Sequence, residues 1–406
     1  MPRRFIHLAF FLFILTALSG LWLRLVPFVD STGLPYDHIL HGHSHIAILG
    51  WAFFGVYITL LKLLWPSLQE KKHATLLGLV IFSVSLVMFL AFLYEGYAMY
   101  SIIMSTLHIF VEYWAIVFIF KQLRKQKDIP KISQFMIKGA LLSLFLSSIG
   151  PFALGYLGAT GLKDSPFFDM SIYFFLHFQY NGFLTLFLLG LFFIILHRSK
   201  IPFSKEISRT GFWLYLISLF PWYLSSIMWT GLGSFAKLLA TLGTIGQFIG
   251  MVLIFIAISS AFKEMRKKFA PIISFGVVFS LIFLIAKSSM ELGLISNELS
   301  ALVFDTRSVI IGYLHLTLLG FISFFIFVQF QMVNLLQVAH QRSMYGMVIF
   351  LAGFLLNELI LFLQGLSSWT GTFTVPYSFE LLVLASILLS LAILIYWSSL
   401  TRKASG

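Results

Sequence analysis

The sequence predicts an all-α fold, a polytopic membrane bundle of about twelve transmembrane helices that forms a single integral membrane domain over residues 1–406. Of the 406 residues, 59% are hydrophobic and only 10% are charged, whereas soluble globular proteins carry roughly 25% charged residues. Apolar runs long enough to cross about 30 Å of hydrocarbon recur along the whole chain. Because so few charged residues cannot cover the surface of a water-soluble protein, most of this protein's surface must face lipid.

Each predicted span holds roughly 20 predominantly apolar residues. The connections between them are short and leave no room for a soluble domain. The chain opens on Met-Pro-Arg-Arg and an apolar run, as a secretory signal does, but no small-residue cleavage site follows, so we expect a retained first helix. The predicted spans cover residues 5–27, 40–64, 75–95, 99–121, 135–157, 170–196, 209–229, 236–261, 270–289, 308–334, 345–364 and 378–398.

The distribution of charge predicts the orientation. With a cytoplasmic N-terminus, most of the 27 Lys and Arg lie inside, and the exceptions on or near the outer side are Arg24, Lys163, Lys237, Lys287 and Arg307. This asymmetry predicts a multi-pass protein of the bacterial cytoplasmic membrane with both termini cytoplasmic and lipid as a partner. The net charge of +12 sits in short clusters between apolar runs, which excludes a nucleic-acid groove. The absence of cysteine excludes disulfides and thiolate ligands.

A weak internal rhythm runs through the even-numbered spans. In three of them a histidine is followed by four residues, a glycine and an aromatic residue. His108 repeats the spacing with two aromatic residues. The interval from His177 to His315 is twice the usual step, and the missing step between them falls at Gln247. The rhythm predicts repeated helix hairpins and leaves repeat ancestry open. The three motifs are His45-Gly50-Trp51, His177-Gly182-Phe183 and His315-Gly320-Phe321.

Four histidines of this pattern are predicted to form one layer. His45, His108, His177 and His315 each lie roughly 6–10 residues from the outer end of a span, which places them about 8–15 Å below the outer surface. Ionisable side chains at such depth are costly and usually face a partner. Each could be a neutral core histidine bonded to a neighbour, but the common depth favours ligands for iron or copper.

The densest cluster lies at the outer start of the second span, where His38 is followed by His41, His43 and His45. On a helix, His41 and His45 share a face and His43 points about 200° away, so one helix could serve two centres. Gly50 is predicted to share the face of His43 and to leave room for a flat macrocycle. Because His38 and His41 lie near the interface, they could instead be solvated.

Three further candidates come from spans four and six. His108 and Glu112 are four residues apart and share a face, either as a metal ligand with its carboxylate partner or as a structural pair. Glu112 could also belong to a proton path. In span six, His177 and Tyr180 are close enough along the helix to touch the same centre.

Four charged residues complete the set of candidates. Arg24 and Arg307 lie at the outer ends of spans one and ten, where they could hold heme propionates or merely extend to the interface. Glu358 and Lys287 are candidates for buried functional groups, with an interface position as the alternative for Lys287.

At these residues the chain resembles the heme-copper oxidase superfamily, in the sense of its catalytic subunit I. The resemblance lies in the run His-Ser-His-Ile-Ala-Ile-Leu-Gly-Trp that starts at His43, and in His177 and His315. It implies a twelve-helix bundle with both ends inside. It also implies a heme b whose axial ligands are His43 or His45 together with His315, and copper or a second iron near His177 and Tyr180.

The chain departs from the family pattern in two places. The seventh span lacks the adjacent histidine pair and carries Pro221, Trp222 and Tyr223, and the tenth has Tyr313 where the family has a second histidine. A full three-histidine copper site is therefore not implied, and the chain is also similar to the NnrS-type heme- and copper-containing membrane proteins associated with nitric oxide stress. The candidate metal ligands are His41, His43, His45, His108, Glu112, His177, Tyr180 and His315.

The expected function is that of a heme-binding membrane protein in electron transfer, or in binding or reduction of O2 or NO. A diatomic gas and an electron-donor protein or quinol are the implied partners, and turnover as an oxidoreductase stays open. The alternative is a proton- or metal-coupled transporter that uses the intramembrane layer of histidine and glutamate. A heme spectrum separates the two classes.

Overall fold

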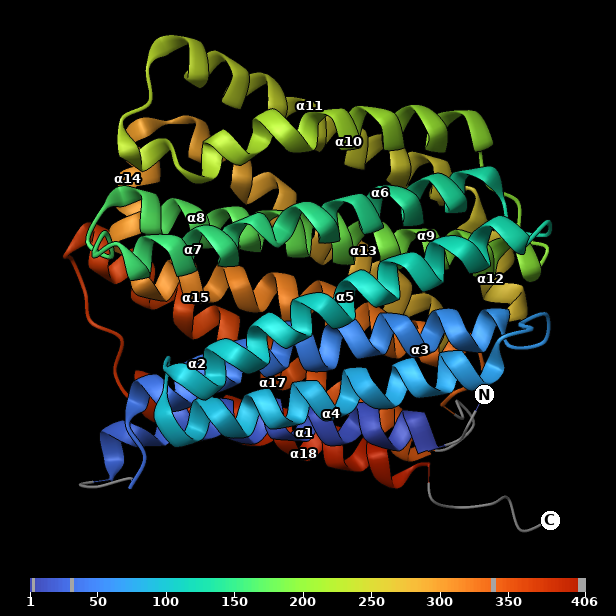
Figure 1. The fold of residues 1–406 in the computed structure, drawn as a ribbon, viewed down its shortest axis with the longest axis horizontal. Coiled ribbons are helices and arrows are strands. Elements are labelled where there is room, and N and C mark those ends of the chain that lie inside the picture. The colour runs from blue at the N-terminus through green and yellow to red at the C-terminus, as the bar shows by residue number, and fades with distance from the viewer. Residues whose placement is uncertain (2–3, 30–32, 337–340, 401–406) are drawn as a thin grey trace. The chain divides into compact units, whose positions relative to one another are not determined.

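The chain is all-helical and polytopic. A computed structural model describes residue 1 and residues 4–29, 33–336 and 341–400, and these residues contain no strand. Eleven helices within them are long and apolar enough to cross a membrane. This confirms the predicted all-α membrane protein. The chain divides into two compact units, one of residues 1–118 with 326–406 and one of residues 119–325, and each is considered by itself (Figure 1).

The first unit is built around one deeply buried helix. That helix is α2–η2–α3, for which 94% of the best membrane window is buried, against no more than 50% for the other spans of this unit. Trp51 lies on this helix and stacks on Phe13 with ring centroids 4.1 Å apart, and the centroid of the Phe327 ring lies 5.6 Å from that of Trp51. The helices of this unit are α1 (Arg4–Leu25), α2 (Tyr36–His45), η2 (Ile46–Ala52), α3 (Phe53–Leu64), α4 (Lys71–Glu95), α5 (Met99–Lys125) as far as Phe118, α16 (Phe324–Met332) from Ile326, α17 (Gln341–Thr370) and α18 (Ser378–Ser398).

The first and last helices pack together within this unit. The indole Nε1 of Trp397, near the end of α18, donates to Nδ1 of His7, near the start of α1, at 3.0 Å. The two ends of the described chain therefore lie at the same end of the unit. Three residues predicted to be cytoplasmic, Arg3, Arg402 and Lys403, lie outside the described residues.

The second unit repeats this plan around α8–η3–α9, whose best window is also 94% buried. Two of its helices, α10 and α11, lie side by side along their length (Figure 1). Gly243 allows this, because a Cβ there would lie within 3.0 Å of the backbone nitrogen of Trp222. The helices are α6 (Lys131–Ser147), α7 (Ile149–Ala159), α8 (Pro166–Leu176), η3 (His177–Leu184), α9 (Thr185–Arg198), α10 (Lys205–Ser226), α11 (Ser234–Ser259), α12 (Ala261–Lys268), α13 (Pro271–Leu292), α14 (Asn297–Asp305), α15 (Arg307–His315) and η6 (Leu316–Ser323).

The seventh predicted span, residues 209–229, is the one that does not meet the criteria for a membrane-crossing helix. It is helical as α10, but it is not among the eleven apolar spans. It begins with Lys205, Glu206 and Arg209 and contains Pro221, so its sequence is less apolar than that of its neighbours.

Three segments of π-helix coincide with the three histidine motifs of the sequence. The segments η2, η3 and η6 begin at or directly after His45, His177 and His315. His108 and Gln247, which the same rhythm also reached, lie in ordinary α-helix. In a π-helix each N–H bonds to a carbonyl five residues back, and such segments are frequent at functional sites. The three motifs that contain glycine thus share a π-helical backbone, and the other two positions of the rhythm do not.

Candidate functional site

Hydroxyl groups of the same helix bond to carbonyls in two of the π segments. The hydroxyl of Thr185 donates to the Tyr180 carbonyl at 2.7 Å, and the hydroxyl of Ser323 donates to the Leu318 carbonyl at 2.6 Å. Both donors stand five residues after their acceptors, at the same position of the motif. The wider turn of a π-helix leaves backbone carbonyls that need another hydrogen-bond donor. The Thr or Ser eight residues after the histidine supplies this donor and is therefore part of the motif.

In η2 the partners of a carbonyl one position further along the motif, that of Leu49, come from other helices. The Leu49 carbonyl accepts from Ser85 Oγ at 3.3 Å and from His108 Nε2 at 3.2 Å. The other ring nitrogen of His108, Nδ1, lies 3.1 Å from Glu112 Oε1, and both side chains are buried. Because a carbonyl only accepts, Nε2 carries a hydrogen, and one further proton lies between Nδ1 and the carboxyl group. The predicted contact between His108 and Glu112 is present, and both ring nitrogens are hydrogen-bonded.

His43 has the arrangement expected of a metal-binding imidazole. Its Nδ1 lies 2.9 Å from the Thr16 carbonyl and 3.2 Å from Ser19 Oγ, both on α1. The carbonyl fixes the hydrogen on Nδ1, so the neutral ring keeps its lone pair on Nε2. Gly20 lets the ring lie directly on α1, because a Cβ there would come within 2.9 Å of His43 Cε1. Metal-binding histidines are usually oriented in this way, with the second nitrogen donating to a carbonyl or carboxylate.

His41 and His45 share a face, as predicted. Both rings pack against Phe92 and Tyr97, with the ring centroids of His45 and Phe92 4.3 Å apart. Nδ1 of His45 lies 2.9 Å from the carbonyl of His41, one turn back on the same helix. His45 therefore also keeps its lone pair on Nε2, but it is oriented by its own helix rather than by a neighbour.

Gly50 does not lie beside His43. A Cβ at Gly50 would meet Ile46 at 3.0 Å and Ser85 of α4 at 3.6 Å, whereas His43 lies against α1. The shared face was predicted with the period of an α-helix, and η2 changes that period between the two residues. The glycine next to the His43 ring is Gly20.

Arg24 has a carboxylate within electrostatic range. It interacts with Glu358 of α17, and it also lies within range of the His43 imidazole. Glu358 accepts a hydrogen bond from the Asn357 side-chain amide at 3.0 Å. Arg24 and Glu358, singled out separately in the sequence, thus belong to the same part of the first unit as His43.

In the second unit, His177 is fully hydrogen-bonded. Its Nε2 donates to the Leu219 carbonyl at 2.8 Å, and its Nδ1 accepts from the Asn181 amide at 3.2 Å. Trp222 packs edge-on against the ring, with the ring centroids 4.8 Å apart. A metal at His177 would have to displace one of these two bonds.

A buried ion pair lies beside this histidine. The Lys287 ammonium donates to Asn181 Oδ1 and to Glu291 Oε1, the latter at 3.0 Å. The Tyr313 hydroxyl donates to the same carboxylate oxygen. Lys287 is 0% and Glu291 3% exposed, so Lys287 is buried rather than at a surface. The sequence prediction omitted Glu291, although its spacing of four residues from Lys287 in an apolar run could have revealed the pair.

The remaining candidates lie in the second unit. Tyr180 and Tyr313 are hydrogen-bonded, with ring centroids 5.9 Å apart. His315 and Arg307 both have interaction partners. The predicted axial pair combines His43 or His45 of one unit with His315 of the other, and it stays a prediction.

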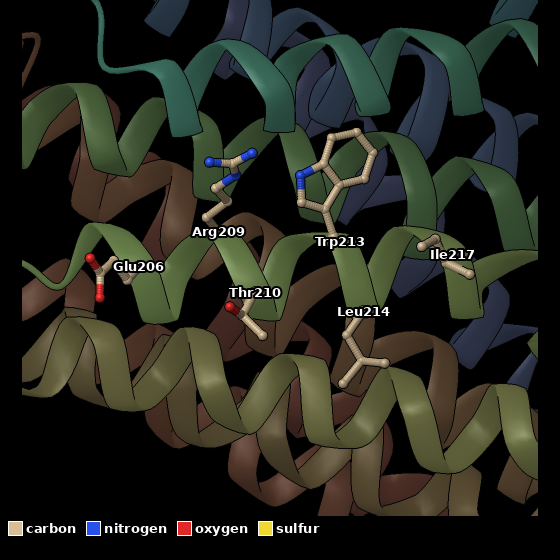
Figure 2. A pocket seen from close by; sticks show the side chains of 6 residues that line it. All are labelled: Glu206, Arg209, Thr210, Trp213, Leu214 and Ile217. Atoms are coloured by element: carbon tan, nitrogen blue, oxygen red, sulfur yellow. The ribbon is translucent and has the colours of Figure 1, made fainter.

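Within the described residues, no group of three or more His, Asp or Glu side chains is placed to hold a metal ion. A hollow on the surface is formed by α10 alone, with the side chains of Arg209 and Trp213 on the same side of the helix (Figure 2). None of the candidate ligands lines it. Comparison of the chain with protein-family models and with curated proteins found no match.

Proposed function

We propose that this protein binds a b-type heme through Nε2 of His43, as a divergent relative of heme-copper oxidase subunit I or of the NnrS-type proteins. Its role would be electron transfer, or binding or reduction of O2 or NO. The observation that carries the proposal is the hydrogen bond from His43 Nδ1 to the Thr16 carbonyl. It selects the tautomer whose free lone pair binds iron.

The donor set of the first unit fits the group. His43 is oriented from α1 by Thr16 and Ser19, and Arg24 supplies a cation that could balance a propionate. When bound, heme supplies one-electron chemistry and a coordination position for a diatomic gas, and its ligands and surroundings set the potential. The protein contributes ring orientation and charge compensation.

Copper or a second iron near His177 and Tyr180 is a weaker part of the proposal, because both His177 nitrogens are hydrogen-bonded. The membrane location supports an electron-donor protein or a quinol as the source of electrons. We place the protein in the bacterial cytoplasmic membrane with both termini inside, on the distribution of its Lys and Arg.

The test is the optical spectrum of the full-length protein, purified in detergent from a heme-replete host. We expect a Soret band and a reduced α band of b type, and we expect both to disappear in His43→Ala. His73→Ala is the matched control, because both ring nitrogens of His73 are hydrogen-bonded, to Glu70 and Trp114. A colourless wild-type protein, or an unchanged spectrum in His43→Ala, would contradict the proposal.

A proton- or metal-coupled transporter is the second candidate. It is favoured by two buried pairs of titratable side chains, His108 with Glu112 and Lys287 with Glu291, because ionisable groups inside membranes often mark proton and ion pathways. Uptake of protons or metal ions into proteoliposomes, together with the absence of a heme spectrum, would support it over the first candidate.

A further inference from the structure

Beside the Lys287–Glu291 pair, two buried oxygen atoms lack hydrogen-bond partners. They are Gln247 Oε1 on α11 and Ser288 Oγ on α13, and the side chains are 0% and 1% exposed. The Gln247 amide nitrogen lies near the Ser288 carbonyl and Glu291 Oε2, at 3.5 Å in each case. Buried polar atoms are nearly always paired, either with protein groups or with ordered water, and contacts this long often contain a bridging water.

The charge of the cluster limits what can bind there. The Lys287 ammonium balances the Glu291 carboxylate, and carboxylate oxygen Oε1 already accepts from Lys287 and Tyr313. Carboxylate oxygen Oε2 has only the long contact to Gln247. Because the pair is formally neutral, a second cation would meet the ammonium charge, and a small neutral molecule is favoured.

We propose that a water molecule binds between Gln247, Ser288 and Glu291, and that it makes the Lys287–Glu291–Tyr313 network a proton-exchange site. The donors and acceptors match: the water would donate to Gln247 Oε1 and Glu291 Oε2 and accept from the Ser288 hydroxyl. Three hydrogen bonds are the typical number for a buried water.

The groups next to this water can pass a proton in series. Tyr180 is hydrogen-bonded to Tyr313, and Tyr313 donates to Glu291. On the other side the series ends at the Asn181 amide, which neither gains nor loses a proton. The route therefore consists of Tyr180, Tyr313, Glu291 and the water. All its members belong to the second unit, so it does not depend on heme at His43.

Hydroxyl-radical footprinting of the full-length protein in nanodiscs tests the proposal, because ionising radiation produces radicals from bound internal water as well as from bulk water. Tyr313 should be labelled several-fold more than Tyr223, another half-buried tyrosine of the second unit, whose hydroxyl donates to the Met170 carbonyl at 2.9 Å. In Gln247→Leu the labelling of Tyr313 should fall to the level of Tyr223. Thr244→Val, on the same helix, should leave it unchanged.

Ser288→Ala removes one of the three bonds and should lower the labelling in part, so it serves if Gln247→Leu does not fold. Equal labelling of Tyr313 and Tyr223 in the wild type would overturn the proposal. A second measurement compares the thermal stability of the protein in sodium chloride and in choline chloride at equal ionic strength, which tests whether a cation binds at the site. If sodium stabilises the wild type and this effect is lost in Gln247→Leu, the site binds a cation rather than water, and the proposal is overturned. Loss or absence of heme would not alter either readout.

Discussion

The central helices of the two units contain the same motif but use their histidines differently. In both α2–η2–α3 and α8–η3–α9, 94% of the most apolar 18-residue window is buried, and both carry a π segment with a glycine and an aromatic residue. In the first unit, His43 and His45 give Nδ1 to a backbone carbonyl and keep a lone pair on Nε2. In the second, both nitrogens of His177 are hydrogen-bonded. The motif thus accompanies the π-helical backbone in both units, whereas the groups around each histidine determine whether one of its ring nitrogens keeps a free lone pair.

The buried carboxylates differ in the same way. In the first unit Glu112 faces His108, and the two share one proton. In the second unit Glu291 faces the Lys287 ammonium. A shared proton can lie on either partner of the first pair, whereas in the second pair an ammonium faces a carboxylate, and removing either group would leave the other buried without its partner.

The largest effect is therefore expected at the ion pair. Lys287→Met leaves Glu291 buried without its cation and should cost about 3–5 kcal/mol of stability. Adding Glu291→Leu should restore most of the loss, because the two apolar residues no longer leave a charge unpaired. Chemical denaturation in detergent measures both variants. A cost of under about 1 kcal/mol for Lys287→Met would show that the pair is solvated, contrary to its burial.

The glycines of the two π segments should differ next. A Cβ at Gly182 would lie well within 3.0 Å of Ser143 Cβ on another helix, whereas the nearest atom to one at Gly50 would be Ile46 Cγ1 of the same helix, at 3.0 Å. Gly182→Ala should cost about 1–3 kcal/mol through overpacking, and Gly50→Ala should cost less. The double variant Gly182→Ala, Ser143→Gly should recover stability. Equal costs for the two single variants would contradict the difference in packing between the segments.

Hydropathy and charge were sufficient to predict the helices, because a membrane-crossing segment must be apolar over roughly 20 residues. They were less decisive for α10, whose charged start and Pro221 lower its apolar character. The face shared by His41 and His45 was predicted correctly because no π segment separates them. The relation of His43 to Gly50 was not, because η2 changes the helical period between them.

The partners of the histidines could not be predicted from the sequence. Nothing local indicates that His43 would meet the Thr16 carbonyl on another helix, or that His177 would meet Leu219. Such contacts depend on how helices pack. The pair of Lys287 and Glu291 is the exception, because the spacing of four residues already places both side chains on one face of a helix.

A smaller effect is expected where a hydroxyl bonds to a carbonyl of η3. Thr185→Val keeps the shape of the side chain but removes the donor to the Tyr180 carbonyl, which should cost about 1–2 kcal/mol because a buried acceptor is left unpaired. Thermal unfolding with and without the substitution measures it. An unchanged stability would show that the π segment does not need this bond.

The smallest effect is expected where a hydroxyl of a neighbouring helix bonds to a carbonyl of η2. Ser85→Ala removes one donor from the Leu49 carbonyl, but His108 Nε2 remains at 3.2 Å and keeps that acceptor paired. The cost should therefore stay below about 0.5 kcal/mol, since the penalty arises mainly from leaving a buried group without any partner. Comparison with Thr185→Val shows whether a π-segment carbonyl with one donor from its own helix depends on that donor more than a carbonyl with two donors from other helices. If Ser85→Ala costs as much as Thr185→Val, then His108 does not hold the carbonyl, and the shared proton inferred between His108 and Glu112 loses its basis.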